Sequence, residues 1–526
     1  MQRVSKCAPL GGTMIDIVEL ESVMRRPSSP EDRLKISCIG IITCNRPLEL
    51  EHCLRSYAEH LQRHERQCDF AVMDDSDDAA GRETCREWLR SFARASRIKV
   101  SYSGREERLN YGCQLASLGI PHELTAFILG NPLGIPASPG ANRNALLLHA
   151  AGEAFLSCDD DSICHVADLR RGRQLVYTVP FCNMLEHIRF VPHGQSSSQV
   201  VPESACDVMA MHEALLGRAL CDLPLPLQNT ARVSVGKMGG RVLSNLIEGS
   251  GRARITISGV LGDCGMPAGS GLMMLTGEAR IRFLQSYEST GIPEVVLGVS
   301  RPTLSLTGPV MTSTATGFDN RVLLPPFTPS GRGEDTFFGV LLAKCLPDAY
   351  FGYVPIALLH APGRSRTYDP LPAAPKFVNL LASILEGCPD VPASSPAERI
   401  RAVGNYLQEC GRVHVREFEA HFLRSTRSWL ALLLENAERL LNSHGAAPTR
   451  WAREMQQWIR RIECNLITPE NLFPVDLADS GLPEERYAAI QRFLERFGEV
   501  LRCWPEIIAA ARRLAENGHR IAGPLA

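Results

Sequence analysis

Two patterns of apolar and polar positions alternate over the first third of the chain. Short, nearly continuous apolar runs, rich in β-branched residues, predict buried strands. These runs cover residues 34–43, 69–76, 98–104 and 154–161. The segments between them carry apolar residues at helical spacing, which predicts helices over residues 48–64, 86–96 and 140–149. Strands that alternate with helices are typical of a parallel α/β sheet.

The middle of the chain is less regular. Residues 166–315 mix helix-like stretches with Gly-rich, strand-like sequence, and we interpret the glycines as turns around strands. Neither a G-x-G-x-x-G fingerprint nor a Walker A motif occurs. Further along, "EDTFFGVLLAKCL" predicts a helix with an acidic first turn. The apolar segment "YFGYVPIALLH" then predicts a strand that ends at His360.

Amphipathic segments dominate the chain after residue 370. Apolar residues recur at helical spacing in five of them, and several begin with an acid or a proline. They cover residues 396–413, 422–444, 451–466, 483–504 and 505–517. This pattern predicts an all-α C-terminal region, which could support formation of a homo-oligomer.

The composition of the chain bears on its possible binding partners and on its location in the cell. The chain has 526 residues, is 44% hydrophobic and carries a formal net charge of -2. No basic face of the kind that binds nucleic acid stands out. The 18 cysteines form no C-x-x-C pair and no zinc-like cluster, so we expect reduced thiols in a cytoplasmic protein. No signal peptide and no transmembrane segment are expected.

Three polar clusters lie at the carboxyl ends of predicted strands. They are Thr43 to Arg46, Asp74 with Asp75, and Asp159 to Asp161. In a parallel α/β sheet the ligand crevice lies at the carboxyl ends of the strands. The three clusters are therefore expected to converge at one edge of one sheet.

The acidic triplet is the most unusual of these clusters, because adjacent carboxylates at a strand end repel one another. A bound Mg²⁺ or Mn²⁺ would neutralise them and bridge them to substrate phosphates. In an extended chain Asp159 and Asp161 would face the same way. The alternatives are a solvated acidic loop, or a helix N-cap at Asp161.

The other candidates each have a structural alternative. Asp74 or Asp75 could accept a hydrogen bond from a ribose or base, or simply form a turn. Glu334 and Asp335 could cap the helix, or supply a general base. His360 could be structural, or a metal ligand.

In order and spacing, these elements resemble the GT-A glycosyltransferases, specifically the family-2-like group. The residues that carry the resemblance are "IGIITCNRPLELEHCLRSY", "FAVMDDS", "GANRNALLLHAAGEAFLSCDDD" with its DxD triplet, and "GRGEDTFFG". It covers residues 35–165 and 317–362. It implies a GT-A fold, which is a Rossmann-like core with a mostly parallel sheet, here with a large insertion and the all-α C-terminal domain. It also implies a transferase that uses a nucleotide-sugar donor.

The resemblance implies roles for individual residues. Thr43, Asn45 and Arg46 would line the nucleotide pocket, and Asp74 or Asp75 would contact the base or ribose. Arg143 would lie near the base or diphosphate, with Asp159 and Asp160 at the nucleotide-sugar. Asp161, with Asp159 and His360, would bind Mn²⁺ or Mg²⁺. Asp335, paired with Glu334, would be the base of an inverting displacement.

The resemblance also implies a division of the chain. Residues 1–33 would be an N-terminal extension, 34–165 the nucleotide-sugar-binding half and 317–369 the catalytic half. Residues 166–316 would form an acceptor-side insertion, and 370–526 the helical domain. The absence of a Q-x-x-R-W motif after His360 argues against a processive synthase.

The identity of the substrates and two other functions stay open. A UDP-sugar is the expected donor, whereas the acceptor could be a glycan, lipid, peptide or small molecule. A nucleotidyl- or phosphoryl-transfer enzyme on a similar sheet is one alternative, although no Gly-rich phosphate loop with a Lys supports it. A non-catalytic nucleotide-sugar-binding protein is the other, and the joint presence of Asp161, Asp335 and His360 speaks against it.

Overall fold

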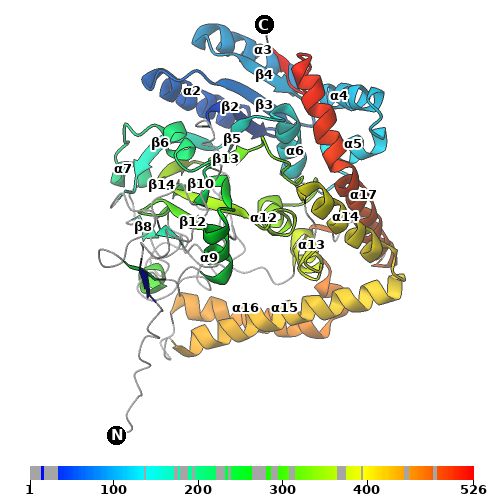
Figure 1. Ribbon diagram of the computed structural model, residues 1–526. Coiled ribbons are helices and arrows are strands. Elements are labelled where there is room, and N and C mark those ends of the chain that lie inside the picture. Colours follow the sequence, from blue (N-terminus) through cyan, green and yellow to red (C-terminus); the bar gives the residue numbers. More distant parts are fainter. Residues whose placement is uncertain are drawn as a thin grey trace.

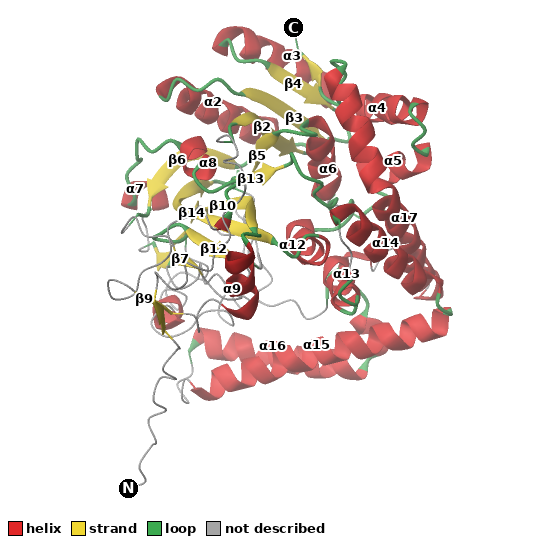
Figure 2. Cartoon of the chain, viewed as in Figure 1, coloured by secondary structure: helices red, strands yellow, loops and turns green. Residues whose placement is uncertain are grey.

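The structure is a computed structural model of the chain, and it contains a mixed α/β core with long helices at its C-terminal end (Figure 1, Figure 2). It describes residues 14–16, 34–135, 138–170, 176–177, 188–191, 196–220, 232–234, 239–263, 280–285, 294–306, 314–363, 375–391, 395–443, 449–477 and 483–525.

A 13-stranded sheet forms the centre of the described molecule, with its main path in the order β15-β4-β3-β2-β5-β13-β10-β14-β12-β7. Its strands are β2 (Ile36–Thr43), β3 (Asp69–Asp74), β4 (Val100–Ser103), β5 (Ala154–Asp159), β6 (Ser162–Asp168), β7 (Val176–Tyr177), β8 (Arg189–Phe190), β10 (Arg252–Gly262), β11 (Val295–Leu297), β12 (Thr303–Ser305), β13 (Thr316–Asp319), β14 (Ala349–His360) and β15 (Gly523–Pro524). A separate antiparallel pair joins β1 (Met14–Asp16) to β9 (Arg232–Ser234).

The predicted parallel sheet is found where the strand and helix patterns alternate. Three neighbouring pairs, β4 with β3, β3 with β2, and β2 with β5, are parallel. From β5 onward the pairing is mixed, because β13 is antiparallel to both β5 and β10, whereas β10 and β14 are parallel. Strand β10 belongs to the predicted insertion of residues 166–316, and it lies in the middle of the sheet.

Alternation along β2 explains why helices cover both faces of the parallel part of the sheet. Ile39 and Ile41 belong to one hydrophobic cluster, together with residues of α2 and α3. Cys38 and Ile42 belong to another, with residues of α4, α5 and α6. Successive side chains of a strand point to opposite faces, so a continuous apolar run is buried on both. The helices are α2 (Pro47–Arg63), α3 (Ala79–Ser96), α4 (Arg105–Ser117), α5 (His122–Leu129) and α6 (Pro139–His149).

Further helices lie between strands β8 and β14 in the sequence. Helix α12 precedes β14, as the sequence predicted. The bounds are α7 (Ser197–Val200), α8 (Val208–Glu213), α9 (Gly239–Glu248) and α12 (Glu334–Cys345).

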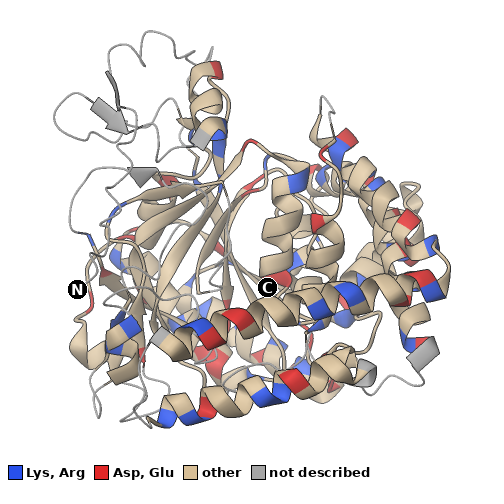
Figure 3. Ribbon diagram, turned by 90° about the horizontal axis from the view of Figure 1, so that it is seen from below, with Lys and Arg blue, Asp and Glu red and all other residues tan. Residues whose placement is uncertain are grey.

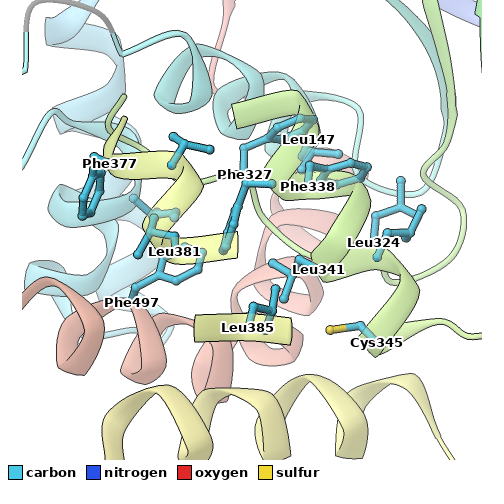
Figure 4. Packing of buried hydrophobic residues seen from close by; sticks show 14 of the residues in the cluster. Leu147, Leu324, Phe327, Phe338, Leu341, Cys345, Phe377, Leu381, Leu385 and Phe497 are labelled. Carbon is cyan, nitrogen blue, oxygen red and sulfur yellow. The ribbon is translucent and has the colours of Figure 1, made fainter. Parts of the chain in front are cut away.

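The C-terminal helices complete the core of the molecule. Phe377, Leu381 and Phe497 belong to the same buried apolar cluster as Phe338 and Leu341 of α12, and the close-up labels all five (Figure 4). Helices α15 and α16 lie side by side, and charged residues of both signs are interspersed along the outer helices (Figure 3). The elements are α13 (Phe377–Glu386), α14 (Pro396–Arg412), α15 (Val415–Ser443), α16 (Arg450–Ile467), the 3-10 helices η4 (Pro469–Leu472) and η5 (Val475–Leu477), and α17 (Pro483–Glu516).

Helix α17 corrects the prediction of two separate helices over residues 483–517. It continues through Pro505, although proline removes one helical hydrogen bond. Trp504, immediately before this proline, is fully buried and donates from its indole nitrogen to the carbonyl of Leu324 at 2.7 Å. Apolar residues on both sides of Pro505 belong to the same core, which holds the two halves in one helix.

The end of the chain returns to the sheet, so the region after residue 370 is not exclusively helical. Strand β15 pairs antiparallel with β4, with Gly523 opposite Tyr102. Among the helices of the described ranges, none combines the length and the apolar character needed to cross a membrane.

Candidate active site

The sheet brings the three polar clusters together at the carboxyl ends of its parallel strands. Strands β2 and β3 end at paired residues, Thr43 and Asp74, and Asp159 of β5 lies opposite Ile42. Two further segments reach the same edge. Strand β14 ends at His360, which pairs with Ser162 immediately after the triplet, and α12 begins at Glu334. The predicted convergence is thus present in the structure.

Arg46 binds two of the three acids of the triplet. It is the N-cap residue of α2, so its backbone position is fixed where β2 passes into this helix. Its guanidinium donates to Asp160 Oδ1 at 2.6 Å and to Asp161 Oδ2 at 2.9 Å. Asp160 also accepts from the Thr43 hydroxyl at 2.8 Å. Two residues expected to line the nucleotide pocket therefore hold Asp160 and Asp161 in place.

His360 contacts Asp161 from the other side. Its Nε2 lies 3.2 Å from Asp161 Oδ1. Its Nδ1 forms a hydrogen bond with the backbone carbonyl of Asp263, and because a carbonyl only accepts, Nδ1 carries the proton. In the imidazolium form, Nε2 also carries a proton and donates it to Asp161 Oδ1, whereas in the neutral form with Nδ1 protonated, Nε2 carries a lone pair. This tautomer is the one that a metal-binding histidine needs.

Asp159 points toward Arg143 of α6, whereas Asp161 points toward Arg46 and His360. The expectation that Asp159 and Asp161 face the same way assumed an extended chain, but residues 160 and 161 form a turn between β5 and β6. Arg143 donates to Asp159 Oδ1 at 2.9 Å, to Ser157 Oγ at 3.0 Å and to Glu334 Oε1 at 2.9 Å. The guanidinium of Arg143 thus joins the acidic triplet to the beginning of α12.

Glu334 and Asp335 have different surroundings. Glu334 is buried and its carboxylate binds Arg143. Asp335 is partly exposed, and its Oδ1 accepts from the backbone N–H of Thr336 at 2.7 Å. Removal of its carboxyl group from bulk water, together with the negative charge of Glu334, raises the pKa of Asp335 to about 7. A carboxylate with this pKa can accept a proton at neutral pH more effectively than an ordinary aspartate.

Within the triplet, the pKa values of Asp160 and Asp161 are shifted in opposite directions. Burial raises the pKa of Asp160 to about 7 against the opposing charge of Arg46. Burial also opposes ionisation of Asp161, but the hydrogen bond and charge of His360, together with Arg46, outweigh it and lower the pKa of Asp161. Asp161 is therefore the acid of the triplet most firmly held as a carboxylate.

Asp74 and Asp75 also differ. Asp74 is buried and binds the Tyr102 hydroxyl at 2.7 Å and the Ser76 N–H at 2.8 Å. Asp75 is partly exposed and accepts from the Ser138 hydroxyl at 2.7 Å. Of the two, Asp75 is the better placed to meet a ligand. Asn45 has a positive φ of 55°, and its Oδ1 accepts from the Asp77 N–H at 3.3 Å, which ties the two loops together.

A divalent cation fits the donor set of Asp161 and His360. In the described part of the chain, no group of three or more His, Cys, Asp and Glu side chains is arranged to hold a metal ion. Mg²⁺ and Mn²⁺ sites, however, often use one or two protein ligands, with substrate phosphates and waters completing the shell. Adjacent ligands at about 2.1 Å from an octahedral ion lie about 3 Å apart. The separation of Asp161 Oδ1 and His360 Nε2 is close to this value.

Sequence reasoning missed two residues that organise this edge. Arg108 is buried and binds the Asp74 carbonyl at 3.2 Å and the Asn142 side chain. Asn142 in turn donates to the Thr43 carbonyl at 3.3 Å. Asn142 belongs to the same "GANRN" segment as Arg143, which was the only available signal. Nothing in the pattern around Arg108 distinguishes it from a surface arginine of α4.

Gly140 of that segment allows α6 to approach the loop before α12. A Cβ atom at this position would lie 1.8 Å from the backbone carbonyl oxygen of Thr328 and 3.4 Å from Cβ of Glu334. Only glycine fits such a contact without moving the backbone. The close approach brings Arg143, one turn further along α6, to Glu334.

No protein-family model matches the chain, and no curated protein matches it. Among solved structures, the chain is similar to a mannosyltransferase from Pyrobaculum calidifontis in complex with GDP-Man and Mn²⁺. The identity is 11% and the TM-score 0.28, over 93% of this chain and 94% of that chain. At this TM-score the match does not establish a shared fold.

Proposed function

We propose that the protein is a metal-dependent GT-A glycosyltransferase that transfers a sugar from a nucleotide-sugar to an acceptor hydroxyl. The observation that carries the proposal is the proximity of two functional pairs at one sheet edge. Asp161 and His360 form one pair, with 3.2 Å between Oδ1 and Nε2. Glu334 and the adjacent Asp335 form the other, linked to the triplet through Arg143.

The donor is proposed to bind across the ends of β2, β3 and β5. Asp75 would accept from the base or ribose, and Asn45 would hold the loop beside it. Asp161 and His360 would hold Mn²⁺ or Mg²⁺, whose charge, when the ion is bound, stabilises the departing diphosphate. A UDP-sugar is the first donor to test.

Asp335 is proposed as the general base of an inverting displacement. The acceptor hydroxyl oxygen forms a bond to the anomeric carbon while the bond from this carbon to the donor phosphate oxygen breaks. The acceptor proton passes to the Asp335 carboxylate. Desolvation of its carboxyl group and the charge of Glu334 give Asp335 the pKa of about 7 that suits this role. Glu334 is proposed to position α12 through Arg143 rather than to take the proton itself.

A donor screen tests this proposal. Release of nucleoside diphosphate from UDP-, GDP- and dTDP-sugars is measured with Mn²⁺ and with EDTA. We expect release from at least one donor, at a rate that depends on the cation. Absence of release, and of nucleotide binding, across the whole set would overturn the proposal.

A further inference from the structure

We propose that Arg46 is an internal counter-ion that competes with a divalent cation for Asp161 and moves to the diphosphate when the nucleotide binds. This inference rests on the proposed function. It adds to that function a coupling between two ligands: the cation binds tightly only together with the nucleotide. It assigns to Arg46 a positioning role beyond lining the pocket.

The contacts of Asp161 are the first support. One carboxylate oxygen, Oδ2, accepts from Arg46 Nη2 at 2.9 Å, and the other, Oδ1, lies 3.2 Å from His360 Nε2. Arg46 Nη1 also binds Asp160 at 2.6 Å. In the protein alone, Arg46 therefore already supplies a positive charge at the place where the triplet would need a cation. A divalent ion at Asp161 and His360 would lie next to a like charge.

The position of Arg46 is the second support. Asp160 and Asp161 are almost fully buried, but 32% of the Arg46 side chain is exposed. The guanidinium can thus leave the two acids toward solvent without passing through the core. Arg143, in contrast, is buried and bound on three sides by Asp159, Ser157 and Glu334. Of these two arginines at the triplet, Arg46 is the one with room to move.

The chemistry of the ligand is the third support. A diphosphate offers guanidinium the same bidentate oxygen geometry as the carboxylates it would leave. Transfer of Arg46 to the diphosphate breaks its hydrogen bond to Asp161 Oδ2 and moves its like charge away from the cation site. Each ligand then strengthens the binding of the other, and the two couplings must be equal because binding linkage is reciprocal.

The test measures Mn²⁺ binding to the full-length protein by electron paramagnetic resonance of the free ion, without nucleotide and with saturating UDP. We expect Arg46→Gln to bind Mn²⁺ alone at least ~10-fold more tightly than wild type, and to lose most of the increase that UDP gives to wild type. Arg46→Lys, which keeps the charge but not the bidentate geometry, should lie between the two. Arg55→Gln is the matched control, because Arg55 lies on the exposed side of α2 and pairs with Glu51.

The outcomes separate this inference from the proposed function. Equal affinity of wild type and Arg46→Gln for Mn²⁺ alone would overturn the counter-ion role, even if both bind Mn²⁺ and UDP together. Failure of UDP to bind either protein would instead count against the donor site, while the comparison with Mn²⁺ alone still decides whether Arg46 competes. Thermal unfolding of each variant shows whether it is folded, and Arg46→Lys decides the question if Arg46→Gln is not.

Discussion

Arg143 and Glu334, 191 residues apart in the sequence, form a buried salt bridge with 2.9 Å between Nε and Oε1. Arg143 lies on α6 and also binds Asp159 at the end of β5. Glu334 begins α12 and precedes Asp335, the proposed base. One arginine thus connects the donor side of the candidate site to its catalytic side.

Loss of Arg143 should destabilise the fold. Arg143→Met would leave Asp159 and Glu334 without their shared cation, and removal of one partner of a buried ion pair costs about 3–5 kcal/mol. Urea unfolding measures the change. The same substitution at Arg94, on the exposed side of α3, should alter the free energy of unfolding by less than ~0.5 kcal/mol. Equal effects of the two variants would argue against the salt bridge as a structural link.

Removal of the proposed base should abolish transfer without abolishing donor binding. Asp335→Asn keeps the size of the side chain but cannot accept the proton, so we expect kcat to fall by about 10²–10⁴-fold. Calorimetry with UDP and Mn²⁺ should give nearly unchanged affinity. Asp348→Asn, after the other end of α12, is the control and should keep wild-type activity. An Asp335→Asn enzyme with wild-type kcat would exclude Asp335 as the base.

The pH dependence of the rate should show the ionisation of Asp335. Because its pKa in the free enzyme is raised to about 7 and the carboxylate is the active form, kcat/KM should fall about tenfold per pH unit below that value. Asp160 also has a pKa of about 7, so its contribution must be separated. An Asp160→Asn variant should keep the acid limb, and the residual activity of Asp335→Asn should lack it. The opposite pattern would assign the limb to Asp160.

Gly140→Ala should disturb the contact between α6 and the loop before α12. The new Cβ would meet the Thr328 carbonyl oxygen at 1.8 Å, so the backbone must shift, at a cost of about 1–3 kcal/mol. Both the melting temperature, measured by thermal unfolding, and kcat should decrease. Gly240→Ala is the matched control, because nothing lies within 4 Å of a Cβ at that position of α9. If Gly140→Ala were as stable and active as this control, the close approach would not matter.

The sequence predicted the parts of the fold that depend on local pattern. The parallel strands β2 to β5, the helix that begins at Glu334 and the strand that ends at His360 all follow from continuous apolar runs and helical spacing. The single helix α17 was not predicted, because the local signal of Pro505 is outweighed by packing of Trp504 in the core. Long-range burial of this kind leaves no trace in a local window.

The sequence predicted where the acids of the candidate site lie on the sheet, but only partly which cations bind them. The positions of Asp74, Asp159 and His360 follow from where their strands end. The sequence suggested that a metal neutralises the triplet, but the structure has Arg46 and Arg143 bound to these acids. Such pairings depend on side-chain directions across α2, α6 and β5, and spacing along the chain does not specify them.

The central claim is tested most directly by calorimetry of UDP binding, with and without Mn²⁺, to wild type and Asp161→Ala. Asp168→Asn, at the far end of β6, is the control for changes in local charge. We predict cation-dependent binding to wild type and to the control, and its loss in Asp161→Ala. Binding that is indifferent to Mn²⁺ and equal in all three proteins would contradict the account, because the triplet would then not anchor the diphosphate.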